Sequence, residues 1–161
     1  MDSALLGEVL SCYKPHCRYL REFSGDGRGR FAIPESCYIE DTGHLNAVEV
    51  NICYNQLLYA SIAMLVRDGT EPAFDTWTMA EFWRRRLSDI LITRIASEFR
   101  RPIDARSFSG ELVLDRIVGR QLRSDEAPLV VLDTTFRFWD AEGGDASGTA
   151  RIAIVDEATG D

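Results

Sequence analysis

The sequence of 161 residues predicts an α+β domain in which an antiparallel sheet wraps around one long central helix. Two patterns favour this fold class. An apolar stretch in the first half has helical periodicity, and four runs in the second half are rich in β-branched and aromatic residues. The chain is long enough to bury a core without disulfides or a metal, so we expect residues 1–161 to form a single domain.

The N-terminal segment, residues 1–25, is expected to form an arm or a short helix that ends in the glycine-rich turn SGDGRGR. The next two segments, RFAIP and SCYIED, are predicted to be short extended stretches around Pro34. They supply a strand ahead of the central helix.

The central helix is predicted from about Asn46 to Val66, because apolar residues recur on nearly every face. Gly69 and Pro72 are its stop signals. The run WTMAEFWRRR predicts a short second helix with Thr78 as its cap. The periodic apolar positions of the central helix are Val48, Val50, Ile52, Cys53, Leu57, Ile62, Met64 and Val66.

Four long strands are predicted at residues 88–102, 107–122, 128–142 and 146–156, separated by Pro102, the SDEAP segment and the EGGD turn. No helical pattern lies between them, which favours antiparallel meander pairing. A long buried helix with such a sheet is the outline of a hotdog fold. A cone-shaped α+β barrel of the ketosteroid-isomerase type is the main competitor, although it usually has more helix before the sheet.

The charge and composition exclude several function classes. A formal net charge of −8 argues against a general nucleic-acid binder. No apolar run reaches the ~20 residues that span a bilayer, so we expect no membrane partner and a cytoplasmic location. The four cysteines lie in the first third of the chain without paired metal-ligand spacing, so no metal site is predicted.

The start of the central helix, in the run TGHLNAVE, carries the candidate chemistry. Asn46 and Glu49 form a capping-box pattern, which explains both residues without catalysis, although Glu49 could instead be a general base. His44 lies just before the helix, where the positive end of the helix dipole favours a neutral imidazole that can accept a proton. The first amides of the helix, near Asn46 and Ala47, are a candidate oxyanion site. Thr42 and Gly43 would allow the tight turn that gives a substrate access.

Further polar residues leave alternatives open. Tyr38, on the strand expected to lead in, either places a phenol near the site or is a half-buried strand residue. Asn55 and Gln56 are either hydrogen-bond partners in the core or groups that position water or substrate. The sequence contains no Ser-His-Asp set, P-loop, dinucleotide fingerprint or H-E-x-x-H motif.

The sequence resembles the FcoT-type family of actinobacterial hotdog proteins over nearly its whole length. The resemblance is carried by CYKPHCRYL, YIEDTGHLNAVEVNICYNQLLYASIA, LSDILITRIASEFRRPI and FRFWDAEGGDASG. Proteins of this family are long-chain acyl thioesterases and (2E)-enoyl-[acyl carrier protein] glycyltransferases. The resemblance supports the hotdog fold over the cone-shaped barrel.

The reaction that the resemblance implies takes place on an α,β-unsaturated acyl thioester of an acyl carrier protein or of CoA, without a cofactor. The amine of glycine adds to the β-carbon and gives a 3-(carboxymethylamino)acyl product, whose thioester is then hydrolysed. Such products enter macrolactam polyketides or isonitrile lipopeptides. The alternatives are a simple acyl thioesterase and a non-catalytic module that binds an acyl chain.

The site residues implied by the resemblance are His44 as the base, together with Tyr38, Asn46 and Asn55. Tyr13 is expected at the substrate, with Tyr19 as the alternative if the arm is shifted by one position. Thr42, Gly43, Ala47 and Glu49 are expected to contact substrate at the helix start, and Arg94 is the possible partner of the glycine carboxylate.

The partners implied are glycine, an acidic acyl carrier protein and further copies of the chain. The carrier is expected to dock on the arginine-rich patch at Arg84 and Arg85, although a solvated face is the simpler interpretation of such a patch. Hotdog sites commonly form across a dimer interface, so we expect a homo-oligomer built from dimers. The acyl tail is expected to lie along the helix at Leu57, Leu58 and Ile62.

Overall fold

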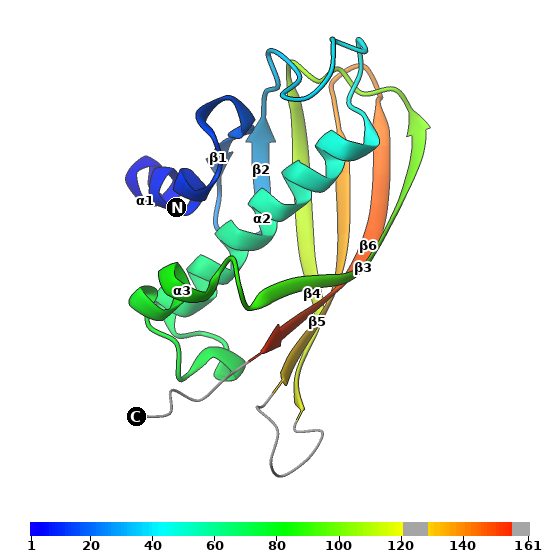
Figure 1. Cartoon of the computed structure of the whole chain (residues 1–161). Coiled ribbons are helices and arrows are strands. Elements are labelled where there is room, and N and C mark those ends of the chain that lie inside the picture. Colours follow the sequence, from blue (N-terminus) through cyan, green and yellow to red (C-terminus); the bar gives the residue numbers. More distant parts are fainter. Residues whose placement is uncertain (121–128, 156–161) are drawn as a thin grey trace.

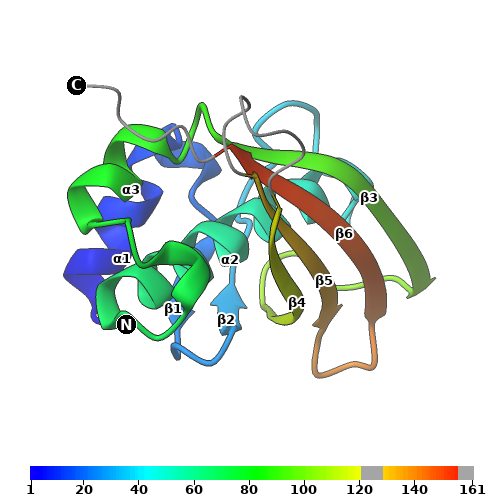
Figure 2. The ribbon, with the colours of Figure 1, turned by 90° about the horizontal axis from the view of Figure 1, so that it is seen from below.

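A curved antiparallel sheet cradles one long helix, α2, in the computed structural model, which describes residues 1–120 and 129–155 (Figure 1). Figure 2 shows the sheet bending around α2, with α1 and α3 on the side of α2 that faces away from the sheet. The predicted α+β class is confirmed. The elements are, in chain order, α1 (Ser3–Val9), 3₁₀ turns at Leu10–Cys12 and Pro15–Cys17, β1 (Leu20–Phe23), β2 (Arg28–Phe31), α2 (Ala47–Asp68), a 3₁₀ turn at Pro72–Phe74, α3 (Met79–Arg85), β3 (Ile90–Arg101), β4 (Phe108–Arg120), β5 (Leu129–Trp139) and β6 (Asp145–Val155).

The order of strands in the sheet is β1-β2-β4-β5-β6-β3, and every pairing is antiparallel. Strands β4, β5 and β6 form the predicted meander. The prediction is wrong for β3, which pairs with β6 and not with its chain neighbour β4, because β2 occupies that side of β4. Among the described residues, β3 is hydrogen-bonded along one edge only.

Helix α2 is the centre of the core, as predicted. It begins after Asn46 and ends at Gly69, whose left-handed φ of 60° forms the C-cap. Alternate side chains of β5 face the helix, and the hydroxyl of Thr134 lies 2.8 Å from that of Tyr54. None of the helices in the described ranges is long and apolar enough to cross a membrane.

Gln56 shows why a polar residue lies in the middle of this core. Its Oε1 accepts hydrogen bonds from the backbone N–H groups of Tyr19 (2.9 Å) and Leu20 (2.8 Å), and its Nε2 donates to the carbonyl of Cys17 (2.6 Å). Buried backbone groups need such partners. Gln56 is therefore a core hydrogen-bond partner that ties the N-terminal arm to α2.

The segments before α2 differ from the prediction in detail. The arm contains α1, two 3₁₀ turns and strand β1, and the glycine-rich stretch already enters β2 at Arg28. The segment SCYIED is not extended sheet. Because β1 and β4 already occupy both edges of β2, the chain after Pro34 has no strand to pair with there and forms an irregular loop up to Asn46.

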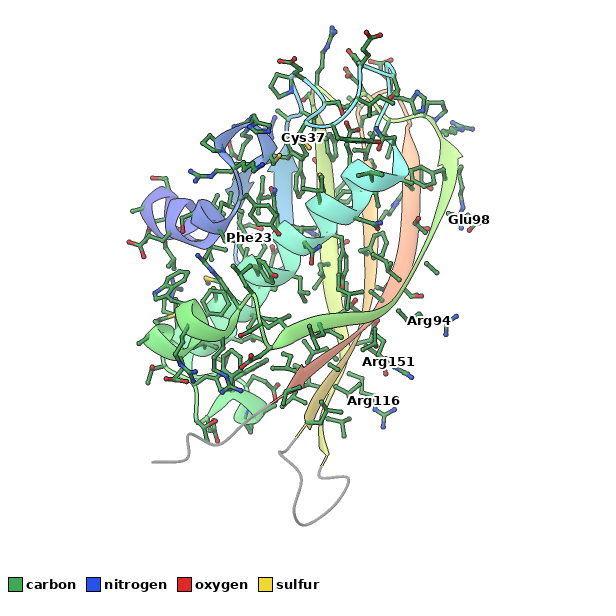
Figure 3. All side chains as sticks on the ribbon, in the orientation of Figure 1. Phe23, Cys37, Arg94, Glu98, Arg116 and Arg151 are labelled. Atoms are coloured by element: carbon green, nitrogen blue, oxygen red, sulfur yellow. The ribbon has the colours of Figure 1, made fainter. Side chains whose placement is uncertain are left out.

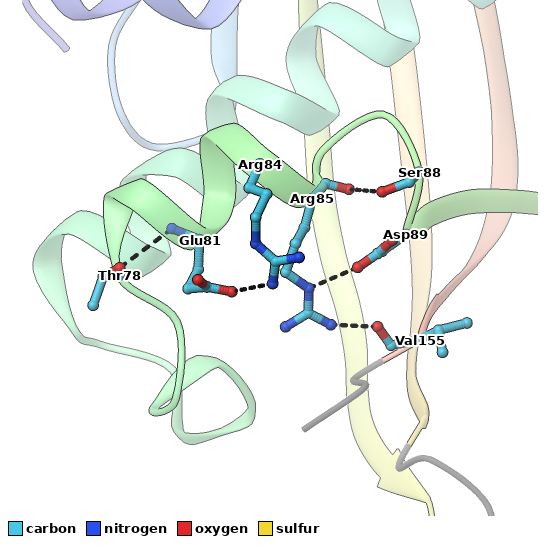
Figure 4. A network of polar contacts seen from close by, with 7 residues as sticks. All are labelled: Thr78, Glu81, Arg84, Arg85, Ser88, Asp89 and Val155. Carbon is cyan, nitrogen blue, oxygen red and sulfur yellow. Dashed lines mark hydrogen bonds and ion pairs between the residues drawn. The ribbon is translucent and has the colours of Figure 1, made fainter. Parts of the chain in front are cut away.

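The arginine-rich patch is largely committed to internal contacts (Figure 4). Thr78 caps α3, as predicted, and Arg84 pairs with Glu81 at 2.6 Å. Arg85 is only 4% exposed and donates to Asp89 (2.7 Å) and to the carbonyl of Val155. The docking patch expected at Arg84 and Arg85 is therefore wrong for Arg85, whose charge is buried and paired. The SDEAP turn expected between two strands falls outside the described residues.

Candidate active site

The start of α2 carries a complete capping box. Oδ1 of Asn46 accepts from the backbone N–H groups of Val48 and Glu49, both at 3.1 Å, and the Glu49 carboxylate accepts from the Asn46 N–H at 3.2 Å. Glu49 is 2% exposed. The capping interpretation of this pair is therefore confirmed.

The side-chain amide of Asn46 has a fixed orientation. Besides the two backbone groups, the hydroxyl of Tyr38 donates to its Oδ1 at 2.8 Å. Three donors around one atom identify it as the oxygen, so Nδ2 is the donor end. That Nδ2 is buried and has no hydrogen-bond partner among the described residues. An unpaired buried donor costs ~1 to 3 kcal/mol, and an acceptor on a bound ligand would offset this cost.

Tyr38 comes from the irregular loop, not from a strand, and its side chain is 50% exposed. Desolvation of the phenol and the nearby Glu49 raise the pKa of Tyr38 above its ordinary value. The phenol is therefore protonated at neutral pH. Its role in this geometry is to donate to Asn46 and hold the amide in place.

A tight turn presents His44 to solvent. Gly43 has φ of +75°, and its N–H donates to the Asp41 carboxylate at 2.8 Å. The Thr42 hydroxyl donates to the carbonyl of His44 at 2.8 Å. An added Cβ at Gly43 would meet no atom within 4 Å, so glycine is needed here for its conformation and not for space. The imidazole of His44 is left exposed, with no hydrogen bond to another described residue.

An open hollow of about 430 Å³ lies between the start of α2, with His44, and the C-terminal end of β3. Ala47 and Asn46 both line this hollow, and within the described part of the chain neither the backbone N–H of Ala47 nor the buried Nδ2 of Asn46 makes a hydrogen bond. The hollow is therefore lined by a candidate base and by two residues that each have an unpaired N–H donor. Its lining residues are His44, Leu45, Asn46, Ala47, Phe99, Arg100, Arg101 and Pro102.

Three predicted site residues lie elsewhere. Asn55 is nine residues along α2 from Asn46, a rise of about 13.5 Å, and is half-buried. Tyr13 packs against Tyr59 at 6.2 Å between ring centroids, and burial raises the pKa of the Tyr13 phenol. Tyr19, its alternative, is fully buried in the core, and its hydroxyl oxygen has no hydrogen-bond partner by distance and angle among the described residues. In this chain neither tyrosine lines the hollow at His44.

Arg94 is on the wrong face of the sheet to meet glycine in this hollow. An extra residue between Ile92 and Arg94 shifts the register of β3, so that Arg94 lies opposite Arg151. The inward position beside it belongs to Ile95, opposite Ala150. Figure 3 shows Arg94 and Arg151 pointing away from α2. The expected contact between Arg94 and substrate is therefore not made within one chain.

The acyl tail cannot follow the expected wall, because Leu57, Leu58 and Ile62 are fully buried. These side chains form the core between α2 and the surrounding elements. An accessible stripe lies instead on another face of α2, at Val48, Asn51, Ile52 and Asn55, which follow the spacing i, i+3, i+4, i+7.

Sequence reasoning missed the β3 side of the hollow. Phe99 is 43% exposed, an unusual state for a large aromatic side chain, and Arg101 has no ion pair in the described residues. The run EFRRPID was noticeable only as a basic patch. No group of three or more potential metal ligands occurs in residues 1–120 and 129–155.

Comparison with known proteins gives consistent results. The FcoT-like thioesterase domain matches residues 8–154. A (2E)-enoyl-[ACP] glycyltransferase from Streptomyces coeruleorubidus is 50% identical, with 96% of this chain and 97% of that protein covered. A protein of the same name from Mycobacterium tuberculosis (strain ATCC 25618 / H37Rv) is 35% identical, with coverage of 94% and 85%.

Two solved structures show the fold. A sigma28-regulated virulence protein from Campylobacter jejuni has a TM-score of 0.55 at 13% identity, with 98% of this chain and 92% of that chain covered. A predicted thioesterase from Bacillus stearothermophilus has a TM-score of 0.51 at 13% identity, with coverage of 82% and 80%. The hotdog fold expected from the sequence is confirmed.

Proposed function

Because the chain belongs to the family of FcoT-like thioesterase domains, we propose that it is a (2E)-enoyl-thioester glycyltransferase. The amine of glycine adds to the β-carbon of an enoyl group held on an acyl carrier protein, and the 3-(carboxymethylamino)acyl thioester is then hydrolysed. The relatives at 50% and 35% identity carry the first activity in their name, and the family carries the second.

The observation that carries this proposal is the unpaired amide of Asn46. The capping box and Tyr38 hold its oxygen, and its Nδ2 has no acceptor among the described residues. Conjugate addition moves electrons from the attacked double bond onto the thioester oxygen. Nδ2 of Asn46 and the N–H of Ala47 would stabilise that enolate, and one such donor is typically worth ~3 to 4 kcal/mol.

His44 supplies the base. Glycine reaches the enzyme with a protonated amine, which cannot attack until a proton is removed. The exposed imidazole takes this proton, the free amine forms the new C–N bond, and the imidazolium returns the proton to the α-carbon of the enolate. The product nitrogen retains two of its three original protons as a secondary ammonium, so charge and protons balance.

Arg101 is our candidate for the glycine carboxylate in place of Arg94. Both arginines of the hollow lie at the end of β3, but Arg100 already pairs with Glu98 at 3.5 Å and with Asp145 at 3.7 Å. Arg101 has no carboxylate partner among the described residues. A free guanidinium is suited to bind a carboxylate through two parallel hydrogen bonds.

Hydrolysis in this scheme uses water in place of the amine, with the same two donors at the thioester oxygen. Asn55 or Tyr13 would hold that water only if substrate or a second chain brings them to the reacting group, since neither lines the hollow here. A simple thioesterase would use the same donors without glycine. A non-catalytic module that binds acyl chains would need neither the base nor the donors.

We further propose a homo-oligomer built from dimers that acts in the cytoplasm. The 12-residue strand β3 has one edge without a strand partner in the described part of the chain, and exposed Leu91 and Phe99 lie along it. Exposed long edges are usually covered in native proteins. A second copy paired there would also lie over the accessible stripe of α2. The β-amino acyl product would serve a macrolactam polyketide or an isonitrile lipopeptide.

The experiment that tests the function is mass spectrometry of products from purified protein and a medium-chain (2E)-enoyl carrier protein, with and without glycine. A glycine adduct that requires enzyme is the expected result, and its release as free acid adds the hydrolytic step. Free enoic acid unaffected by glycine would indicate the simple thioesterase. No product at several chain lengths would leave only the binding module.

A further inference from the structure

A second hollow, of about 380 Å³, lies where the N-terminal arm meets the loop that carries Tyr38. One wall comes from the arm and strand β1, with His16, Arg18 and Arg21. The opposite wall is the loop segment 34–37, which ends one residue before Tyr38. The hollow is therefore next to the loop whose Tyr38 hydroxyl donates to the side-chain amide of Asn46. Asn46 itself lines the hollow at His44.

The charge on this face is unusual for a chain whose net charge is −8. Most exposed arginines in the described residues pair with a carboxylate, as Arg28 does with Glu111 at 2.9 Å. Arg18 and Arg21 instead donate to backbone carbonyls, of Tyr13 (3.0 Å) and Ala32 (3.2 Å), which leaves their charges uncompensated.

Lys14, the only lysine of the chain, is exposed beside them and also lacks a carboxylate partner among the described residues. Glu35 is the one acid in the lining, and it is unpaired there. The face therefore carries an excess of positive charge.

Ser36, which also lines this hollow, has an unpaired hydroxyl group. The Oγ of Ser36 is buried and has no hydrogen-bond partner in the described part of the chain. Guanidinium groups with a neutral hydroxyl donor make a set that suits a phosphate oxygen. An acyl carrier protein presents such a phosphate, where the pantetheine arm is joined to a serine, within an acidic surface.

We propose that this face, formed by Lys14, His16, Arg18, Arg21 and Ser36, is the docking surface for the acyl carrier protein, and that the hollow takes the phosphate of its pantetheine arm. The proposal rests on the function proposed above and names the place of its partner. It replaces the docking patch expected at Arg84 and Arg85.

The arginines on the outer face of the sheet do not fit this role. Arg94 and Arg116 lie on the outer face of the sheet with Arg151, and all three point away from α2 (Figure 3). The sheet itself separates them from the amide of Asn46. A pantetheine arm anchored on the outer face would have to pass around the sheet edge.

The test is the Arg21→Glu variant, with Arg84→Glu as the matched control, because each reverses one exposed arginine. Rates are compared for enoyl groups on the carrier protein, on CoA and on pantetheine without phosphate. We expect Arg21→Glu to lower kcat/KM for the carrier substrate about ten-fold more than for pantetheine, as reversal of a rim charge should. Arg84→Glu should change the two substrates equally.

Three outcomes would overturn the proposal. Equal losses on all three substrates would show that Arg21 acts on folding or on the site. A selective loss for Arg84→Glu would place the carrier at α3. If the carrier and CoA substrates fall by the same factor, the phosphate alone is recognised and no carrier surface exists here.

Binding of the holo-carrier without an acyl group, measured by fluorescence anisotropy in rising salt, separates this proposal from the function. Arg21-dependent and salt-sensitive binding by a protein that adds no glycine would support the docking surface and refute the reaction. Carbodiimide cross-linking gives an independent readout, since Lys14 offers a unique side-chain amine. A carrier peptide joined to Lys14 is expected, and Lys14→Arg should abolish that product. Absence of the Lys14 product under conditions where the carrier is bound would count against the surface.

Discussion

The side-chain amide of Asn46 caps α2 through its oxygen, and we assign its Nδ2 to the reaction. The Asn46→Asp variant separates these two functions. Aspartate keeps an oxygen that can accept from Val48, Glu49 and the Tyr38 hydroxyl, which are the three contacts of the native Oδ1. It replaces Nδ2, the donor without a partner in the described structure, by a second oxygen that carries negative charge at neutral pH.

The expected effects on stability and on rate differ in size. Aspartate and asparagine are about equally good N-caps, but aspartate also buries a charged oxygen where Nδ2 has no partner, so the free energy of unfolding should fall by about 1 to 3 kcal/mol. Loss of one oxyanion donor costs about 3 to 4 kcal/mol in the transition state, so turnover should fall by roughly 10² to 10³. The Asn46→Ala control should lose activity and also about 0.5 to 2 kcal/mol of cap energy.

The assay combines urea unfolding with product formation from the enoyl carrier substrate and saturating glycine. For a domain of this size, 1 kcal/mol corresponds to a shift of about 2 to 4 °C in Tm, which calorimetry resolves. Asn46→Asp within three-fold of native turnover would refute the assignment of Nδ2 as an enolate donor. Loss of folding in Asn46→Asp would refute the account of the cap.

Four further variants test the remaining assignments. His44→Gln should lower glycine addition by about 10² or more while hydrolysis of a saturated acyl thioester continues, and equal loss of both products would reject a role limited to the amine. Tyr38→Phe removes the hydroxyl that orients the N-cap amide. It should lower kcat about five-fold, which corresponds to the free energy of one hydrogen bond, and leave KM for glycine unchanged. A changed KM would mean that the phenol binds glycine. Arg101→Met should raise KM for glycine about ten-fold or more, with Arg100→Met as its control, and equal effects would reject the carboxylate partner. Glu49→Gln keeps a capping box, so hydrolysis should stay within about two-fold, and a fall of about 10² would make Glu49 the base.

The central helix and its cap were predictable because their determinants are local. Each signal depends on residues only a few positions apart in sequence. The structure contains all of them: the apolar periodicity, the capping pair Asn46 and Glu49, and the stop at Gly69. The long strands were predictable for the same reason. Their order was not, because the pairing of β3 with β6 depends on contacts between residues 44 to 64 positions apart.

Arg94 and Tyr38 show where local reasoning fails. Alternation along β3 would have to be counted across an extra residue at Thr93, and one extra residue reverses which face every later side chain occupies. Tyr38 was expected on a strand because its segment is rich in Cys, Tyr and Ile, but both edges of β2 are already taken. In each case the neighbour that decides the outcome is distant in sequence.

The Asn, Gln and Glu side chains of α2 and its N-cap fall into three groups according to their position on the helix. Those at its start, Asn46 and Glu49, satisfy the first amides of the helix. Gln56, in the middle, satisfies the backbone of β1 and the arm. Asn51 and Asn55 lie on the accessible stripe of the helix, where water can satisfy their amide groups. The one amide of this helix with a buried atom left unpaired is that of Asn46. A helix that needed Asn46 only as a cap could use serine, which is an equally good N-cap and has no amide donor to bury. The free-energy cost of burying Nδ2 unpaired is explained if a substrate oxygen accepts a hydrogen bond from it. We therefore assign the chemistry to this end of the helix.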